Sequence, residues 1–177
     1  MNEATGQAPD SSGAVVHPPV AWVLSVGGGL VLDRFYPLPF VPEMIQGVLV
    51  GGIVFLAGLA LLIWAAMTFG RAGTEIQIHR PTSTIVEAGP YRFTRNPIYM
   101  GMFLGLIGFS MVFDSLWLLI LLLPFYLVIR HGVVAREEAH LERKFGDVYR
   151  AYKARQALAL SLSRKSAVLR QRHAKNI

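Results

Sequence analysis

The sequence predicts an all-α, polytopic membrane protein with about four transmembrane helices, followed by cytoplasmic helices. Two observations predict this fold class, and a third narrows the chemistry. Hydrophobic residues make up 53% of the 177 residues and charged residues only 16%, whereas a soluble domain has about 25% charged residues. Long stretches of the chain contain no charged residue, and most Lys and Arg residues lie between and after these stretches. Cys is absent, which excludes disulfide frameworks, thiolate metal sites and cysteine nucleophiles.

The N-terminal part is predicted to contain a tail and two spans. Residues 1–17 are small and polar without Lys or Arg; because a secretory signal needs a basic segment before its apolar stretch, we expect a disordered tail there. The first span covers about residues 19–40 and includes the charged pair Asp33 and Arg34. The second covers residues 44–69, which have no charged residue and exceed the ~20 residues needed to cross the hydrocarbon.

A polar segment separates these spans from a second apolar pair. Residues 70–96 carry charged side chains among Gly, Pro and Thr, and a segment of this length is more often functional than a plain connector. Spans are then predicted over about residues 97–113 and 115–131, joined by a short break as a tight antiparallel helical hairpin. Asn96 and Pro97 suit the N-cap and the first position of the first of these helices.

The C-terminal part is charged and helical in pattern. Gly146 indicates a helix end, which divides this part into cytoplasmic helices over about residues 131–145 and 148–160. Residues 18–160 are therefore expected to form one membrane domain. The remaining basic tail, residues 161–177, lies either on an anionic membrane surface or in solvent.

The distribution of positive charge predicts the orientation in the membrane. Four spans place residues 1–17, 70–96 and 130–177 on one side. That side holds four Lys and Arg in the middle segment and twelve in the C-terminal part, out of 17 in the chain, which leaves only Arg34 on the other side. Because cytoplasmic segments are enriched in Lys and Arg, we expect this side to be cytoplasmic. An active site is expected there, where the two polar segments meet.

The first candidate functional segment is GPYRFTRNPIYMG, residues 89–101. It combines a turn that carries Arg92 and Arg95 with a capped helix N-terminus. Free backbone N–H groups and the helix dipole favour an anionic group at such a place. The alternative is that both arginines only mark the membrane boundary and bind lipid phosphates.

The second candidate segment contains the adjacent acids Glu137 and Glu138. Adjacent helical residues point about 100° apart, so at most one of them faces a given partner squarely. A carboxylate near the basic segment would balance its charge; the alternative is a solvated helix with ordinary salt bridges. The five His residues are too scattered for a metal site, so no metal is expected. Gly101 and Gly105 have the spacing of closely packed membrane helices, and could also leave room for a ligand.

Together the two segments carry a family resemblance. RPTST at residues 80–84 precedes the run at residues 89–101, and EExxLxxxFGxxYxxY follows at residues 137–152. In this order the motifs resemble the isoprenylcysteine carboxyl methyltransferase family, and the phospholipid N-methyltransferases are similar to it in the same segments. The resemblance covers about residues 20–155 of the chain.

The resemblance implies an integral membrane enzyme that uses S-adenosylmethionine to methylate a lipophilic acceptor. Arg95 matches the arginine of the family's Arg-His-Pro motif near the methyl donor, and Arg155 falls where eukaryotic members carry an arginine close to the reacting centre. These two and Glu138 are the implied catalytic residues. The cofactor is expected between the motif loop, the following helix and the double-glutamate segment. The implied cofactor-binding residues are Gly89, Pro90, Tyr91, Arg92, Asn96, Pro97, Tyr99, Gly101, Glu137 and Glu138.

The chain departs from the family pattern in two places. Asn96 replaces the histidine of the Arg-His-Pro motif, as in bacterial members, and Asn cannot titrate near neutral pH. After Arg155 a basic tail replaces the family's apolar ending. A carboxylate acceptor would be held by Arg95 or Arg155, whereas an amine acceptor would need Glu138 or Glu137 as a base. The acceptor therefore stays open.

Two other functions remain as alternatives at this point. One is a phospholipid or small-molecule N-, O- or S-methyltransferase. The other is a non-catalytic membrane scaffold that binds anionic lipids or a partner through its basic face. Membrane lipids and a lipophilic acceptor are the expected partners, and neither nucleic acid nor metal is expected. The asparagine variant points to the inner membrane of a bacterium, with the active site at the cytoplasmic face.

Overall fold

The structure, a computed structural model, describes residues 16–71 and 86–156. Within these ranges the regular structure is entirely helical, without a strand, which confirms the predicted all-α class. The predicted basic tail at residues 161–177 lies outside the described residues, as do nearly all of the N-terminal tail and the RPTST run at residues 80–84.

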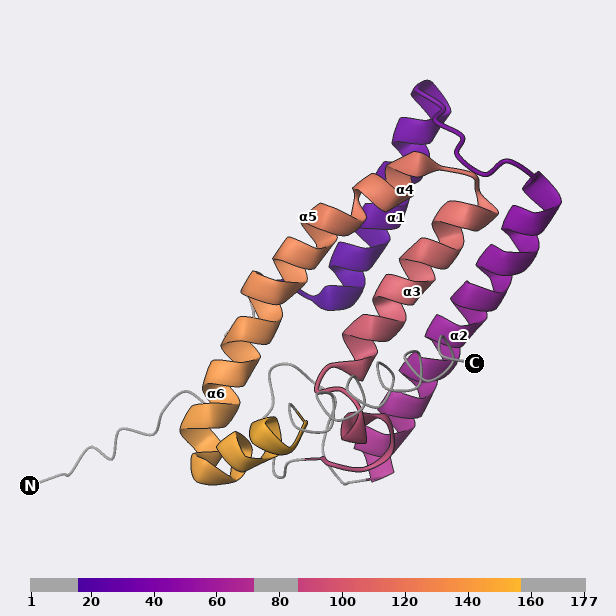
Figure 1. The fold of residues 1–177 in the computed structure, drawn as a ribbon. Coiled ribbons are helices and arrows are strands. Elements are labelled where there is room, and N and C mark those ends of the chain that lie inside the picture. The colour runs from indigo at the N-terminus through magenta and orange to yellow at the C-terminus, as the bar shows by residue number, and fades with distance from the viewer. Residues whose placement is uncertain (1–15, 72–85, 157–177) are drawn as a thin grey trace, which may run out of the picture.

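The first two helices run in opposite directions and lie on different sides of the bundle, the first beside residues 116–127 and the second beside residues 97–112 (Figure 1). Helix α1 covers Pro18–Phe35 and helix α2 covers Met44–Arg71. Helix α1 is thus shorter than the predicted span at residues 19–40. The reason is local, because three prolines at positions 37, 39 and 42 cannot continue a hydrogen-bonded helix.

The second half of the chain is a helical hairpin with a long second arm. Helix α3 covers Pro97–Val112, and after a tight turn α4 (Leu116–Ile120) and α5 (Leu122–Leu127) follow. A π-helical segment, η2 (Val128–Val134), then leads without a break into α6 (Ala135–Phe145). The predicted hairpin is confirmed. The helix also continues through residue 131, where the sequence predicts the membrane boundary.

In the described part of the chain, two helices are by length and composition able to cross a membrane: Ile45–Arg71, and the continuous stretch Leu116–Phe145. Helix α3 is apolar but shorter. Only 17% of the apolar window of the first helix is buried inside the protein, whereas the core helix of a soluble protein would be mostly buried. Large side chains such as Ile45, Leu49 and Ile53 are therefore left exposed, which suits a lipid environment.

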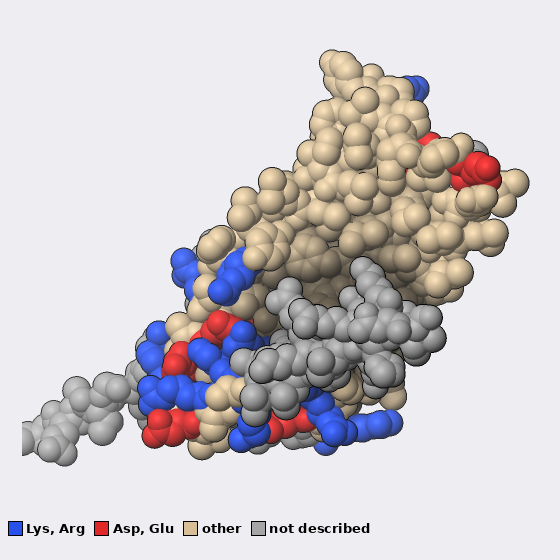
Figure 2. Space-filling model, viewed as in Figure 1, with Lys and Arg blue, Asp and Glu red and all other residues tan. Residues whose placement is uncertain are grey.

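Charged side chains are concentrated at one end of the molecule. Figure 2 shows Lys, Arg, Asp and Glu crowded around α6 and the segment after it, below a body of uncharged surface with a few charges at the far end. This separation matches the alternation of apolar and basic segments along the sequence. It places the two motif segments at the charged end.

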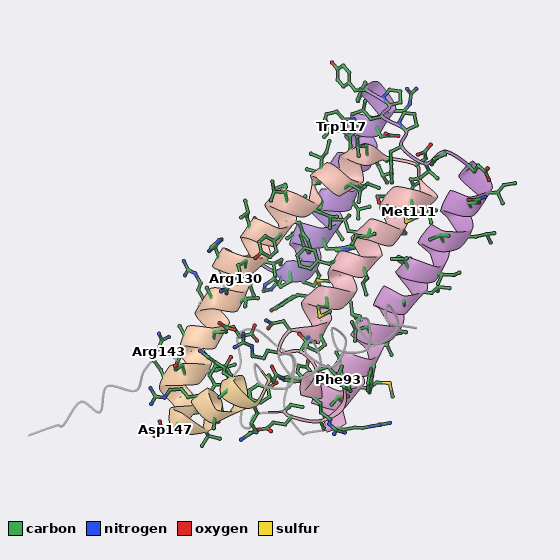
Figure 3. All side chains as sticks on the ribbon, viewed as in Figure 1. Phe93, Met111, Trp117, Arg130, Arg143 and Asp147 are labelled. Atoms are coloured by element: carbon green, nitrogen blue, oxygen red, sulfur yellow. The ribbon has the colours of Figure 1, made fainter. Side chains whose placement is uncertain are left out.

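The opposite end is held by contacts between its two loops. Asp114, with a φ of 48°, accepts hydrogen bonds from the backbone N–H groups of Phe40 (2.8 Å) and Val41 (2.7 Å). Trp117, labelled at this end in Figure 3, donates its indole N–H to the Tyr36 carbonyl at 2.6 Å. The α3–α4 turn thereby fixes the loop between α1 and α2.

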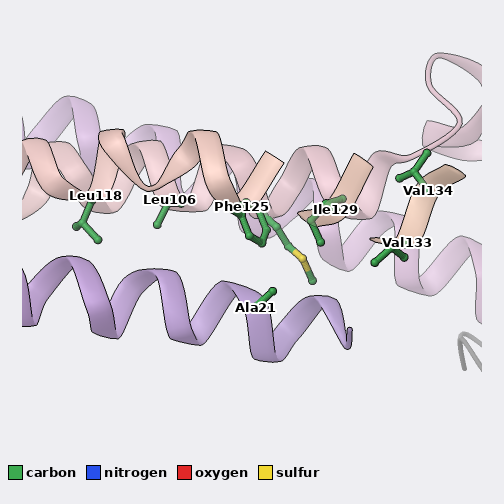
Figure 4. Packing of buried hydrophobic residues seen from close by; sticks show 8 residues of the cluster. Ala21, Leu106, Leu118, Phe125, Ile129, Val133 and Val134 are labelled. Atoms are coloured by element: carbon green, nitrogen blue, oxygen red, sulfur yellow. The ribbon is translucent and has the colours of Figure 1, made fainter. Parts of the chain in front are cut away.

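Helix α3 lies in the middle of the bundle and packs on both sides. On one side, a core that includes Leu106, Leu118 and Phe125 lies between α1, α3 and the second hairpin arm (Figure 4). On the other side α3 touches α2 at backbone distance, because a Cβ on Gly58 would lie 2.7 Å from the Gly101 carbonyl oxygen. The close approach predicted from the glycine spacing is confirmed at Gly101, and it fixes the start of α3.

Candidate active site

The candidate site lies where the motif loop meets α6 and the helical residues 147–156. Phe93 of the loop and Arg143 and Asp147 of the acidic segment are at the same end of the molecule, far from Trp117 (Figure 3). The sequence predicts this meeting of the two polar segments, and the structure confirms it.

The GPYR turn is built onto the end of α2. It forms a short 3-10 helix, η1, over Gly89–Arg92. Gly89 has a φ of +56°, and a Cβ there would lie 2.5 Å from the Thr68 hydroxyl, so only glycine fits. Pro90 is fully buried, and the Tyr91 ring packs on Phe69 with 5.4 Å between ring centroids. These residues fix where the chain enters the site.

Helix α3 begins next to this turn. Asn96 occupies the predicted N-cap position and the buried Pro97 the first helical position. The Asn96 side chain makes no capping hydrogen bond; its backbone N–H donates to the Thr94 hydroxyl at 3.3 Å instead. Because the Asn96 side-chain amide does not cap the helix, its N–H donors and its oxygen acceptor can bind a ligand.

The two adjacent glutamates of α6 face different partners. The Tyr99 hydroxyl donates to Glu137 Oε2 at 3.1 Å, which joins α3 to α6. Arg95 Nη1 lies 3.5 Å from Glu138 Oε1, with side chains 36% and 21% exposed. Partly buried pairs of this kind are less screened by water than surface pairs. The divergence expected for adjacent helical residues is confirmed, and each acid meets one motif residue.

The segment at residues 147–156 covers the turn. The Tyr152 hydroxyl and the Gln156 side-chain amide both donate to the Tyr91 carbonyl oxygen, the first at 3.0 Å. Arg155 forms an ion pair with Glu87 just before the turn. With side chains 58% and 44% exposed, this pair lies at the surface. The structure therefore shows Arg155 in a contact between segments.

Three buried tyrosines near these contacts have raised pKa values. Burial, followed by the nearby Glu137, raises the pKa of Tyr91 well above its usual value. Burial and then Glu138 raise the pKa of Tyr149. Burial also raises the pKa of Tyr152 to about 12, although its hydrogen bond with Gln156 acts the other way. At neutral pH all three hydroxyls keep their protons and can donate hydrogen bonds.

A cavity of about 670 Å³ opens beside Arg95. This volume is in the range of small-molecule sites. Its lining residues are Thr94, Arg95, Asn96, Glu142, Arg150, Lys153, Ala154 and Gln156.

Several lining residues were not predicted as site residues. Arg150, Lys153 and Ala154 follow one another at helical spacing, so the signal was present in the sequence, but only the fold shows that their face meets the motif loop. Lys153 is held near Glu142 at 3.3 Å and lies over the Tyr149 ring. Arg150 lies 2.9 Å from Asp147. Together with the Arg95–Glu138 pair, this gives each basic side chain that lines the cavity an acidic neighbour.

The predicted site residues have different roles in the structure. Arg95, Tyr99, Glu137 and Glu138 are linked by the two contacts Tyr99–Glu137 and Arg95–Glu138, whereas Tyr91 is held by Tyr152 and Gln156. Others serve the backbone: Gly89 and Pro90 shape the turn, Pro97 starts α3, and Gly101 packs on α2. Arg92 is the exposed last residue of η1. Among the described residues no cluster of three or more metal-binding side chains occurs.

Comparison with known protein families identifies the region that carries the motifs. A family model described as phospholipid methyltransferase matches residues 47–148, more than half of the chain. The matched region includes most of α2, the motif loop, α3 and both glutamates. No curated protein and no solved structure matches the chain.

Proposed function

The chain belongs to the phospholipid methyltransferase family, and from that premise we propose that it is a multi-pass membrane enzyme that transfers the methyl group of S-adenosylmethionine to a lipophilic acceptor. The family indicates a membrane methyltransferase. The observation that carries the finer proposal is the pair of contacts Tyr99–Glu137 and Arg95–Glu138, which join the two motif segments.

The proposed topology has four spans. Helix α2 and the long second arm of the hairpin cross the membrane as long helices. Helices α1, with 18 residues, and α3, with 16, are about 27 and 24 Å long, slightly less than the ~30 Å of hydrocarbon. Local thinning of the bilayer accommodates such short spans at modest cost. The charged end then lies at the cytoplasmic face, in a bacterial inner membrane.

The donor set suits S-adenosylmethionine. This cofactor supplies an electrophilic methyl group on a positively charged sulfur, next to an amino acid part and a nucleoside. The carboxylates of Glu137 and Glu138 would stabilise a positive charge next to them, and Arg95 can bind a carboxylate group. The cofactor-binding set proposed from the motifs is Gly89, Pro90, Tyr91, Arg92, Asn96, Pro97, Tyr99, Gly101, Glu137 and Glu138. Within it, Gly89, Pro90, Pro97 and Gly101 act through the backbone that they shape.

Positioning is the main task of the protein in methyl transfer, since the reaction is an in-line displacement that needs aligned groups. Arg95, held by Glu138, orients an anionic group next to the cavity. Glu138 or Glu137 takes the proton when the acceptor is an amine. Asn96 only donates and accepts hydrogen bonds. Arg155, which contacts Glu87 just before the turn, is the third residue of the proposed catalytic set.

The cavity beside Arg95 is proposed to admit the polar end of the acceptor. Its basic side chains Arg150 and Lys153 suit a phosphate, and Glu142 suits an ammonium group. The apolar surface of the helices would accommodate the acyl chains. A phospholipid acceptor therefore fits the cavity and the family, whereas an isoprenylcysteine carboxylate is the second candidate, favoured by the motif resemblance and by Arg95.

The test is transfer of a radiolabelled methyl group by detergent-purified protein. One reaction contains phospholipid vesicles with ethanolamine headgroups, and the other a prenylated cysteine. We expect label in the lipid fraction of the first reaction. Label only in the second would assign the carboxylate acceptor. A folded protein that labels neither acceptor nor a total lipid extract would contradict the proposal and favour the scaffold alternative.

A further inference from the structure

We propose that Tyr152 and Gln156 are positioning residues that hold the Tyr91 carbonyl and thereby fix the turn leading to Arg95. This inference rests on the proposed function. It concerns two residues that lie beyond the family-matched region, which ends at residue 148.

Two side chains one helical turn apart converge on a single backbone oxygen. The Tyr152 hydroxyl donates to the Tyr91 carbonyl oxygen at 3.0 Å, and the Gln156 amide donates to the same oxygen. The Gln156 amide also donates to the Tyr152 hydroxyl at 2.8 Å. The three groups form a closed triangle of hydrogen bonds, so each side chain holds the other in place.

The burial of these groups makes the contact specific. Tyr91 and Tyr152 are 6% exposed and Gln156 is 7% exposed. A glutamine is rarely buried without a hydrogen-bonded partner, and packing alone would be served by an apolar side chain of similar length. A buried carbonyl that loses its donors pays the full desolvation penalty. The arrangement therefore favours one position of the turn over all others.

The held carbonyl lies at a sensitive point of the motif loop. Tyr91 is in the middle of η1, whose last turn is closed by hydrogen bonds from the N–H groups of Phe93 and Thr94 to the Pro90 carbonyl, at 3.1 and 3.2 Å. Arg95 follows directly. A turn that moves away from residues 147–156 would therefore carry Arg95 away from Glu138.

The test uses Tyr152→Phe, Gln156→Met and the double variant in the full-length protein. Each change keeps the approximate shape and removes a donor. The binding-competent turn then becomes a minor population, which weakens apparent cofactor affinity in proportion. We expect KM for S-adenosylmethionine to rise about tenfold in the double variant, with kcat within about threefold of wild type, because Arg95 and Glu138 are intact.

Matched controls exist at distant sites. Tyr126→Phe removes a hydroxyl from an exposed tyrosine of α5, and Gln46→Met removes an amide from an exposed glutamine at the far end of α2. Both controls should keep the wild-type KM and kcat. A thermal unfolding midpoint close to wild type in the double variant separates a loosened turn from a loosened protein.

Amide hydrogen exchange supplies a readout that needs no enzymatic activity. We expect faster exchange in peptides covering residues 88–96 of the double variant, and unchanged exchange in α2. Unchanged exchange and unchanged KM would overturn the proposal, and so would a parallel fall of kcat, affinity and thermal stability, which indicates a merely structural role. If wild-type protein transfers no methyl group, the proposed function fails, while the exchange comparison still decides whether these residues hold the turn.

Discussion

Glu137 and Glu138 show what single residues contribute to the site. Their adjacency in a helix predicts that their side chains diverge. In the structure Glu137 accepts a hydrogen bond from Tyr99, and Glu138 forms an ion pair with Arg95. The pairing itself could not be predicted from spacing, since it depends on how the loop and α6 are placed by the bundle. The motif resemblance singled out these residues, and the geometry shows that each of the two adjacent acids contacts a different motif residue.

Other residues have roles that the sequence did not reveal. The glycine spacing predicted close packing at Gly101, and the motif resemblance placed it beside the cofactor; the structure adds the partner, the Gly58 carbonyl oxygen of α2, 2.7 Å from its would-be Cβ. Arg155 is in a surface ion pair with Glu87, a partner 68 positions away along the chain. Gln156 carries no motif signal, because a buried amide that bonds to a backbone carbonyl is recognised only in three dimensions.

At the residue scale, Arg95→Ala and Glu138→Ala should each abolish methyl transfer without loss of folding. Removing a group that positions or deprotonates a reactant lowers the rate by about 10²-fold or more. Arg143→Ala, an exposed change on the same helix as Glu138, is the matched control and should retain the wild-type rate. Full activity of both site variants would show that the motif assignment is misplaced.

At the scale of helices, the sequence predicted which helices form better than it predicted the residues at which they end. The apolar pattern predicted the hairpin of α3 and the following arm, and Asn96-Pro97 predicted the start of α3. The prolines that follow Phe35 end α1 there, although the apolar pattern of the sequence continues to residue 40. The π-helical segment Val128–Val134 was not predicted; its buried residues Ile129, Val133 and Val134 belong to the core shared with α1 and α3.

The packing of α2 on α3 gives a prediction with adjacent positions as test and control. A Cβ on Gly51 would lie 2.7 Å from the Gly108 carbonyl oxygen, so Gly51→Ala should destabilise the fold by about 1–3 kcal/mol. Gly52, on the same helix, has nothing within 4 Å of its would-be Cβ. Gly52→Ala should therefore be neutral or slightly stabilising. Thermal unfolding in detergent measures both, and equal midpoints for the two variants would contradict the packing described.

At the scale of the whole molecule, the charged surface and the exposed apolar surface lie in different parts of the protein. The charged end contains both motif segments, and the exposed apolar side chains lie along the helices toward the other end (Figure 2). Composition and the positions of Lys and Arg predicted this division directly. The contact of two polar segments that are far apart in the sequence followed from the even number of predicted spans, because an odd number would separate them.

The orientation can be tested cleanly because the chain has no Cys. Tyr36→Cys places a thiol in the loop between α1 and α2, and Arg143→Cys places one on α6. In right-side-out membrane vesicles, an impermeant maleimide should label the first variant, and the second only after the membrane is permeabilised. Labelling of both positions in intact vesicles would contradict the four-span arrangement.

The most direct measurement of the central claim is calorimetric titration of the detergent-purified, folded protein with S-adenosylhomocysteine, the demethylated form of the proposed cofactor. It needs no knowledge of the acceptor. We expect saturable binding at one site per chain, weakened in Glu138→Ala. Absence of binding in wild-type protein with an intact unfolding transition would contradict that claim.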